Sequence, residues 1–278
     1  MARVGFWGRR PAIIGTALIL ALFLTGCQTT AEDDYVEKPV GELYSKANAE
    51  LKARKYKAAA KSFEEVERQH PYSEWAKKSI LMSAYAYYEA SEYDSAIATG
   101  KRYLGLHPGS DDAPYAQYIV ATSYYEQIVD VGRDQDLTER ALKELNEVVR
   151  KYPDSDYARD ARLKMDLARN HLAGKEMEIG RYYLKKRAYI AAINRFKVVV
   201  EKYQTTSHIE EALARLTESY MALGVQSEAQ TAAAVLGANY PGSKWYEESY
   251  VLLKSDGLAP REDQASWISR AWRSISRT

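Results

Sequence analysis

The sequence predicts an all-α protein built as an array of paired helices, and three observations point to this class. The prolines Pro71, Pro108 and Pro153 lie 37 and 45 residues apart, and Pro241 follows after 88, or two periods if Gln204 takes the place of a proline. Small residues recur where paired helices are expected to cross. Similar turns close the helical pattern five times: His70–Ser73, His107–Ser110, Tyr152–Ser155, Tyr203–Ser207 and Tyr240–Ser243. A period of this size predicts a solenoid, which presents extended surfaces to partners.

The first 26 residues have the features of an export signal. Three arginines up to Arg10 precede an apolar stretch, Ile13 to Leu24, that is short for a membrane span. The following Leu24-Thr25-Gly26-Cys27 resembles the bacterial lipobox, whose cysteine is diacylated before cleavage behind it. We therefore expect residues 1–26 to be a lipoprotein signal peptide and Cys27 to be lipidated. The alternatives are a free thiol behind an ordinary signal and an uncleaved anchor.

The residues after Cys27 predict the location. In the lipoproteins that the lipobox resembles, an Asp in the next position favours inner-membrane retention, and this chain has Gln28. We therefore expect the cell outer membrane, periplasmic face, with the protein held by its N-terminal lipid. Residues 27–40 are polar and acidic and end near Pro39, so they predict a tether rather than a folded element.

Composition and motifs argue against an enzyme. The formal net charge of +1 predicts no nucleic-acid partner. Because Cys27 is the only cysteine, the lipidated chain would have no disulfide, thiolate metal site or catalytic thiol. No glycine-rich phosphate loop, nucleophile elbow or metal-spaced His and Glu pair occurs, so no catalytic residue, metal or cofactor is expected. Of the four histidines, His70 and His107 take the place of turn tyrosines and are expected to pack at helix ends.

The repeat units become visible when each turn proline is set at position 32 of a 34-residue unit. Small residues then fall at positions 8 and 20, and aromatic residues at 11 and 24. Members of this pattern are Ala47, Ala59, Phe63, Ala84, Tyr87, Ala96, Gly180, Tyr183, Ala192, Phe196, Tyr220 and Ala229. The pattern resembles the tetratricopeptide repeat, and it predicts a right-handed superhelix of five such repeats with a C-terminal capping helix. Residues 41–155 would hold repeats 1–3, and residues 156–254 repeats 4–5 and the capping helix from Lys244.

Two irregularities interrupt the array. Repeat three fits only with an insertion around Val129 to Asp136, whose aspartates lack the spacing of a calcium loop. We expect Asp136 to cap the next helix together with Glu139. The stretch from Tyr157 to Lys186 contains no proline and predicts one long helix, shared by the two blocks of repeats, with a soft boundary at Asp156.

The groove-facing positions of the first helices carry a run of tyrosines in the N-terminal half. These positions, 2, 5, 9 and 12, project to one side of a helix at about 100° per residue. They are Tyr44, Tyr85, Tyr88, Tyr115, Tyr118 and Tyr125, the candidate substrate-peptide groove. In repeats four and five the same positions hold Met177, Arg181, Leu184, Ala214, Glu218 and Met221. Tyrosines could stack on an extended peptide, or they could pack against neighbouring helices, and the sequence leaves both open.

The last segment, 255–278, predicts an amphipathic or flexible tail. Trp267, Ile268, Ala271, Trp272 and Ile275 share one helical face, with arginines including Arg277 outside it. Such a helix could dock on a partner, touch a lipid surface or fold back on the repeats.

Three stretches carry a resemblance to a known family: Tyr85–Tyr88, Tyr152–Ala161 and Ala188–Arg195. With the lipobox and the repeats, they make the chain similar to the tetratricopeptide-repeat lipoproteins of the outer-membrane β-barrel assembly machinery. The resemblance covers about Glu42 to Pro241, and the departures are Gln204 and the tryptophan-containing tail.

The resemblance implies a non-enzymatic scaffold. Its C-terminal half would bind the periplasmic domains of the barrel subunit BamA, alongside other assembly-complex lipoproteins. Its N-terminal half would help recognise unfolded outer-membrane β-barrel proteins. The candidate partner-binding residues are Arg181, Lys185 and Arg195, of which Arg195 matches a family arginine. The alternative is a periplasmic scaffold of the same repeat type for cell-wall enzymes or pilus biogenesis.

Overall fold

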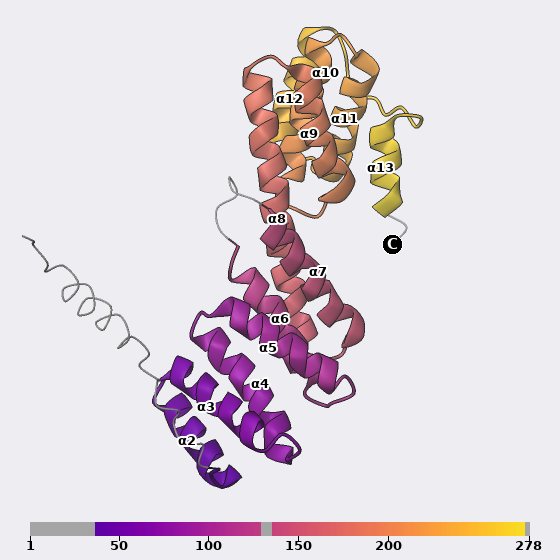
Figure 1. The fold of residues 1–278 in the computed structure, drawn as a ribbon. Coiled ribbons are helices and arrows are strands. Elements are labelled where there is room, and N and C mark those ends of the chain that lie inside the picture. The colour runs from indigo at the N-terminus through magenta and orange to yellow at the C-terminus, as the bar shows by residue number, and fades with distance from the viewer. Residues whose placement is uncertain (1–36, 129–134, 276–278) are drawn as a thin grey trace, which may run out of the picture. The chain divides into compact units, whose positions relative to one another are not determined.

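The computed structural model describes residues 37–128 and 135–275, and the regular structure of these residues is entirely helical (Figure 1). The helices are α2 (Val40–Lys52), α3 (Tyr56–Gln69), α4 (Glu74–Glu89), α5 (Tyr93–Leu106), α6 (Ala113–Tyr125), α7 (Asp136–Lys151), α8 (Asp156–Lys185), α9 (Tyr189–Lys202), α10 (Ile209–Ala222), α11 (Gln226–Asn239), α12 (Lys244–Ser255) and α13 (Trp267–Ile275). The predicted signal peptide, Cys27, most of the tether, the aspartates of the insertion up to Asp134, and Arg277 lie outside the described residues.

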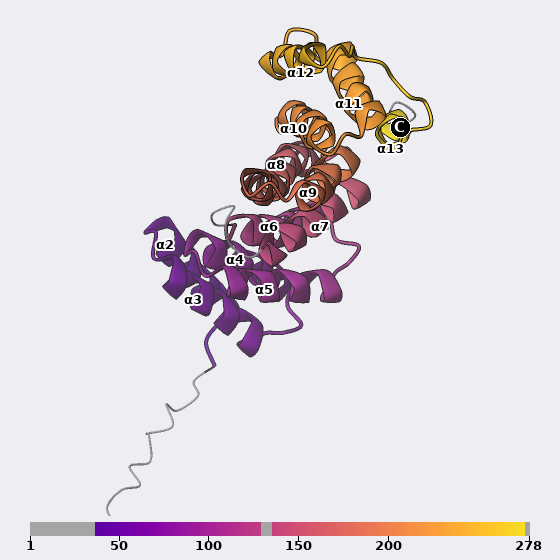
Figure 2. The ribbon, with the colours of Figure 1, turned by 90° about the horizontal axis from the view of Figure 1, so that it is seen from above.

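Consecutive helices from α2 to α11 pack against each other as pairs, and the first helices of successive pairs also touch: α2 packs on α4, α4 on α6, and α6 on α8 (Figure 2). The all-α prediction and the pairing of helices are confirmed. The count of five repeats and the right hand of the superhelix stay predictions. Helix α12 packs on α10 and α11, which is the place expected of a capping helix.

The turns inside the pairs α2–α3, α4–α5, α8–α9 and α10–α11 each contain a residue in the left-handed conformation. Arg54, Ser91, Arg187 and Gly224 occupy it, with φ between 57° and 73°. Each follows a helix whose last carbonyls are satisfied by the turn, as when Lys55 N donates to Glu50 O. This geometry reverses the chain within a few residues, so the second helix of each pair returns along the first.

The recurrent turns between pairs are explained by their hydrogen bonds. The aromatic or imidazole residue caps the helix before it, and its N–H donates to the carbonyl four residues back, as from His70 to Val66 and from Tyr240 to Leu236. The serines Ser73 and Ser155 then accept a hydrogen bond from the third residue of the next helix. These residues therefore recur because one ends a helix and the other begins the next.

Gln204 does not disturb its turn. Tyr203 ends α9 in a conformation close to that of the other turn residues, and Thr206 Oγ1 donates to the Tyr203 carbonyl at 2.7 Å. His107 lies with its ring centroid 5.3 Å from that of Tyr103, which confirms its expected packing role. The doubt that the missing proline raises about this turn is therefore answered by the backbone geometry.

Small residues permit the close helix crossings, as the repeat pattern predicts. Ala47, Ala59 and Ala192 are fully buried, and the Phe196 ring fills the space beside Gly180. A Cβ atom built on Gly180 would lie 2.4 Å from Phe196 Cε1. The Phe196 ring can therefore pack directly against the backbone of α8 because Gly180 has no side chain.

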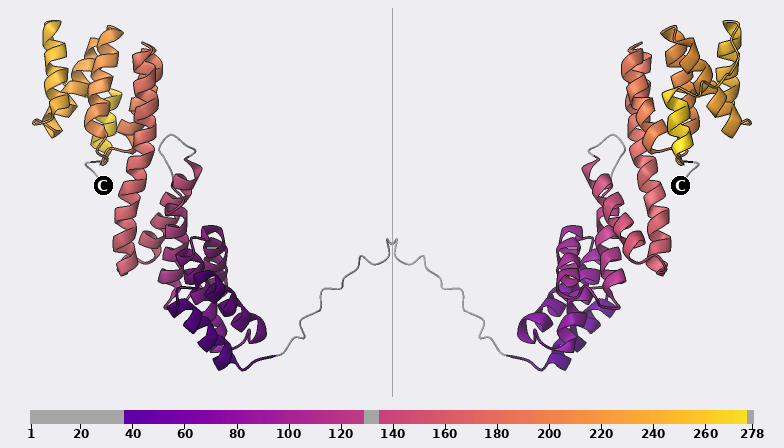
Figure 3. Two further views of the ribbon diagram at one scale, coloured as in Figure 1. Left: turned by 90° about the vertical axis from the view of Figure 1, so that its left-hand side faces the viewer. Right: turned by 90° about the vertical axis from the view of Figure 1, so that its right-hand side faces the viewer.

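The long helix predicted from Tyr157 to Lys186 is confirmed as α8, which Figure 3 shows as one continuous element. It packs on α6 and α7 and also on α9. The capping prediction for Asp136 is wrong, because α7 begins at Asp136 and its N-cap is Gln135. Asp136 lies one residue inside the helix, where its carboxylate pairs with Arg140 at 2.7 Å.

The tail folds back on the repeats, which is one of the three alternatives that the sequence leaves open. Helix α13 packs on α9 and α11, and Ile268 is fully buried there. Trp267, Ala271 and Trp272 pack against the same core. The apolar face of α13 is thus covered by the protein itself and is not presented to a lipid surface in this structure.

Candidate functional site: a tyrosine ladder and a charged C-terminal surface

Four half-buried tyrosines form a connected row across α4, α6 and α8, which we call the tyrosine ladder: Tyr85, Tyr115, Tyr157 and Tyr118. The ring centroids of Tyr85 and Tyr115 are 6.4 Å apart. The Tyr157 ring lies 5.3 Å from that of Tyr115 and 5.2 Å from that of Tyr118. Because α4, α6 and α8 are the first helices of three successive pairs, the ladder runs across the pairs rather than along one helix.

The ladder ends in a polar group on α8. Tyr118 donates its phenol hydrogen to Asp160 Oδ2, and Lys164 Nζ pairs with the same oxygen at 3.1 Å. The Lys164 ammonium also lies 5.3 Å from the centre of the Tyr125 ring. Tyr125 is thereby joined to the ladder through Lys164, so this end offers a cation, a carboxylate and an aromatic face side by side.

Burial raises the pKa of several phenols in and beside the ladder. Desolvation raises the pKa of Tyr115, and nearby phenols raise it further. Desolvation also raises the pKa of Tyr118, with the Asp160 contact adding to it, and raises that of Tyr88 to about 12. The ladder is therefore an uncharged surface of rings whose hydroxyl groups can donate and accept hydrogen bonds at neutral pH.

The remaining predicted groove tyrosines do not all join the ladder. Tyr44 is only 8% exposed and packs against Phe63 and Trp75, with centroid distances of 5.5 and 4.6 Å. It is a core residue, which is the alternative the sequence leaves open for such rings. Tyr88 is half-buried and contacts the Tyr93 ring at 6.0 Å.

Sequence reasoning missed Tyr157 and Asp160 as members of this surface. Counting the fourth repeat back from Gln204 leaves the N-terminal half of α8 outside any 34-residue unit. In the structure that half continues the stack of first helices, since α8 packs on α6. The length of the predicted helix could have indicated this. A helix long enough to serve two repeat units packs on the preceding pair with its first half and on the following helix with its second.

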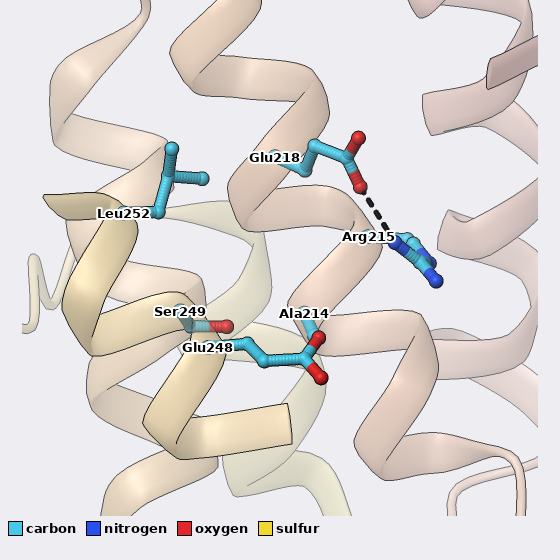
Figure 4. A pocket seen from close by; sticks show the side chains of 6 residues that line it. All are labelled: Ala214, Arg215, Glu218, Glu248, Ser249 and Leu252. Carbon is cyan, nitrogen blue, oxygen red and sulfur yellow. Dashed lines mark hydrogen bonds and ion pairs between the residues drawn. The ribbon is translucent and has the colours of Figure 1, made fainter. Parts of the chain in front are cut away.

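The C-terminal half has ion pairs between its first helices, where the N-terminal half has tyrosine rings. Arg181 on α8 pairs with Glu211 on α10 at 2.8 Å, and Arg215 contacts Glu211 at 3.5 Å and Glu218 at 2.8 Å. The Arg215 guanidinium also lies 4.9 Å from the Trp245 ring centre. Arg215 and Glu218 border a shallow hollow of about 270 Å³ between α10 and α12, together with Ala214, Glu248, Ser249 and Leu252 (Figure 4).

The three predicted partner-binding residues lie on two helices. Arg181 and the exposed Lys185 are on α8, and Arg195 on α9 pairs with Glu176 of α8 at 3.3 Å. Both arginines are already held by carboxylates, so a partner would have to share or displace these ion pairs. The carboxylate partner of Arg181 is on α10 and that of Arg195 is on α8.

An exposed apolar surface near the α8–α9 turn was also missed. Ile190 and Leu223 are 68% and 40% exposed. They border a hollow with Arg187, Ala188, Tyr189, Ala191 and Asn194. We call this surface the turn patch, and it combines an apolar floor with a basic edge. An exposed apolar surface rimmed by polar residues is typical of a protein–protein contact.

Asp160 gives a pH-dependent prediction. Burial alone would raise the pKa of this carboxyl, but the hydrogen bonds from Tyr118 and Lys164 hold it below its ordinary value. A lowered pKa means that the carboxylate stabilises the fold above the unfolded pKa of about 3.9, and this contribution is lost as pH falls through the folded pKa. We expect Asp160→Asn to destabilise at pH 7 by at most about 1 kcal/mol, because exposure screens the pair. The difference should vanish near pH 2.

Urea unfolding of the two chains at several pH values measures this difference. Asp166→Asn is the matched control, since Asp166 pairs with Arg169 on a more exposed part of α8. An Asp160→Asn chain whose stability deficit is the same at pH 7 and at low pH would contradict the prediction.

The described residues contain no helix long and apolar enough to cross a membrane. Across the same ranges, no three His, Cys, Asp or Glu residues come together as a metal site.

Comparisons with known proteins agree on one family. The family model YfiO, described as an outer membrane lipoprotein, matches residues 36–236. The outer membrane protein assembly factor BamD of Caulobacter vibrioides is 49% identical over 254 residues, which cover 90% of this chain and 83% of that protein. BamD of Rickettsia prowazekii is 43% identical, covering 87% of this chain and 97% of that protein. The TPR2AB domain of yeast Sti1, in a solved structure, covers 78% of this chain and 85% of its own at a TM-score of 0.40 and 13% identity, a similarity that carries no functional information.

Proposed function

Since the chain belongs to the YfiO family of outer membrane lipoproteins and is a component of the outer-membrane protein assembly machinery, we propose a separate role for each of its two halves. The N-terminal half receives unfolded β-barrel substrates on the tyrosine ladder. The C-terminal half binds the periplasmic domains of BamA. The protein acts as a scaffold, without a catalytic step of its own.

The observation that carries the substrate half of the proposal is the ladder. The centroids of contacting rings lie 5.2–6.4 Å apart. All four rings are half-buried, so part of each ring is exposed to solvent. Strands of outer-membrane barrels alternate apolar and polar residues and carry aromatic girdles. Tyrosine rings can stack on such side chains at low entropic cost while their hydroxyls bond to unpaired strand backbone. An uncharged row of phenols therefore suits an unfolded barrel strand.

The turn patch supports the partner half. Ile190 and Leu223 provide apolar area in the C-terminal half, and Arg187 gives the patch a basic edge. Arg195 lies on the same helix as Ile190, and Arg181 and Lys185 lie on the preceding helix α8. We propose that a periplasmic domain of BamA covers this patch and also contacts these basic residues on α8 and α9, while other lipoproteins of the complex bind elsewhere.

The membrane side of the proposal depends on Cys27. The matching family is described as an outer membrane lipoprotein, and the lipobox ending at Cys27 supplies a chemical means of attachment. We propose that Cys27 carries the lipid on the periplasmic face and that residues 28–40 tether the repeats to it. Cys27→Ser would then release the protein from outer-membrane fractions.

Site-specific photo-crosslinking tests the two halves together. A benzoylphenylalanine at Tyr85 is expected to capture unfolded barrel substrates, and one at Ile190 to capture BamA. The control position is Tyr72, which is fully exposed in the turn before α4 and belongs to neither surface. Equal substrate capture at Tyr72 and Tyr85 would contradict the ladder's role. Capture of a cell-wall synthase instead of BamA at Ile190 would support the alternative scaffold function.

A further inference from the structure

Helix α13 lies after the helix pairs in the chain and packs back onto two of their helices. It packs on α9 and on α11, which are the second helices of two successive pairs. Figure 1 shows it lying beside both, after the chain has passed the end of α12. Helix α10 also packs on α9 and α11, so this junction has two bridging helices. Among the described helices, the earlier second helices α3, α5 and α7 are bridged by the intervening first helices α4 and α6 alone.

The connection into α13 is held to α11 along its length. Gln230 Nε2 donates to the Ala259 carbonyl at 2.7 Å, and Arg261 N donates to the Gln230 carbonyl at 3.3 Å. Asp263 N donates to Thr231 Oγ1 at 3.1 Å. These hydrogen bonds fix the connection on α11, so they also fix the place where α13 begins.

Docking of α13 combines burial with specific polar contacts. Ile268 is fully buried, and Trp267 Nε1 donates to Tyr220 Oη of α10 at 2.9 Å. Lys197 of α9 lies 4.9 Å from the centre of the Trp267 ring. The Trp272 ring meets that of Tyr240, at the end of α11, edge-on at 6.3 Å. The helix is thus attached to three helices of the last two pairs.

Gln204 supplies a further attachment, in the turn between α9 and α10. Its Nε2 donates to the Ala271 carbonyl of α13 at 3.2 Å. All four of the other turns have a proline directly after the capping aromatic or imidazole residue: Pro71, Pro108, Pro153 and Pro241. Proline has no side-chain donor. The glutamine that replaces proline in this turn therefore supplies the hydrogen bond to the tail helix.

We propose that α13 is a strap that clamps α9 to α11 and so fixes the angle between the last two helix pairs, with Gln204 as its anchor in the repeat array. In a solenoid each unit normally contacts only its neighbours, so the angle between units depends on those contacts alone. The strap adds a second connection across one junction. It thereby holds the ionic surface of α8 and α10, where Arg181 meets Glu211, in one arrangement.

Hydrogen exchange of the full chain tests the anchor. Gln204→Ala is expected to speed amide exchange in residues 267–275 by about two- to tenfold, the equilibrium equivalent of one hydrogen bond. Thr205→Ala is the matched control, an exposed residue in the same turn, and it should leave exchange unchanged. Equal exchange of α13 in the two variants would overturn the role of Gln204.

The clamp itself is tested by undocking the whole helix. Ile268→Glu places a charge in the buried contact and is expected to remove exchange protection from 267–275, whereas Ser274→Glu on the exposed side should not. Spin labels at Lys202→Cys on α9 and Ala238→Cys on α11, with Cys27→Ser, report the distance between these helices. Undocking should broaden and shift the distance distribution.

An unchanged distance distribution with an undocked α13 would overturn the strap and leave α13 as an appendage. The milder Trp267→Phe, which removes the hydrogen bond to Tyr220 and part of the ring but adds no charge, covers the case in which Ile268→Glu fails to fold. It should raise exchange in 267–275 and widen the distance distribution in the same direction.

Discussion

Replacing Tyr157 by alanine is expected to weaken binding of a peptide from the C-terminal strand of an outer-membrane barrel protein by about 30-fold, because aromatic anchors at binding hot spots contribute about 2 kcal/mol. Tyr157 is the middle of the ladder, with the rings of Tyr115 and Tyr118 on either side of it. Its loss removes one ring, separates Tyr118 from the rest of the ladder and leaves Tyr115 with Tyr85 alone. Fluorescence anisotropy with a labelled peptide measures the affinity.

Three controls separate binding from folding. Tyr157→Phe keeps the ring and should stay within about threefold of the original affinity, since the area buried is the same. Tyr182→Ala removes an exposed ring from the far end of the same helix and should have no effect. The free energy of unfolding is measured for each chain. If Tyr157→Ala binds the peptide as the original chain does, or if its loss of binding merely follows a loss of folding, the ladder is a packing feature.

Replacing Gly180 by alanine is expected to lower the free energy of unfolding by about 1–3 kcal/mol relative to the same change at Gly105, the cost of overpacking a closed core. A Cβ at Gly180 would lie 2.4–2.8 Å from three carbons of the fully buried Phe196 ring, whereas a Cβ at Gly105 meets no atom within 4 Å. Both glycines are helical, so the gain in helix propensity on changing to alanine is common to the two variants.

Urea unfolding monitored by circular dichroism measures the difference between the two variants. A second variant, Gly180→Ala with Phe196→Leu, provides space for the new methyl group and should recover part of the loss. Equal stabilities of Gly180→Ala and Gly105→Ala would mean that α8 and α9 can separate slightly without cost, which would contradict the close packing seen between them.

Local rules made much of the fold predictable from sequence. Ser155 begins α8 as an N-cap, and Tyr152 ends α7, because these roles depend on bonds to residues close in the chain. The uninterrupted pattern of α8 likewise needed no distant information. The capping prediction failed at Asp136 because a helix start can shift by one residue while keeping its composition.

The candidate site was predicted in part. Tyr85, Tyr115 and Tyr118 were chosen from their position in the repeat, and the structure joins them in one row. Tyr44 was chosen by the same rule but is buried, and Trp75 from α4, the first helix of the next pair, packs against it. Helical periodicity gives the direction of a side chain, and it cannot say whether a neighbouring helix covers that side.

The repeated turns, the small residues at helix crossings and the family membership were determined by the sequence, since each depends on residue identities at fixed spacings. Tertiary structure alone decided that Tyr157 joins Tyr115 to Tyr118, and that Gln204 meets Ala271 across 67 positions of the chain. Both depend on how helices stack after they form. The packing of one helix on another is set by the summed fit of many side chains, and no spacing within either helix records it.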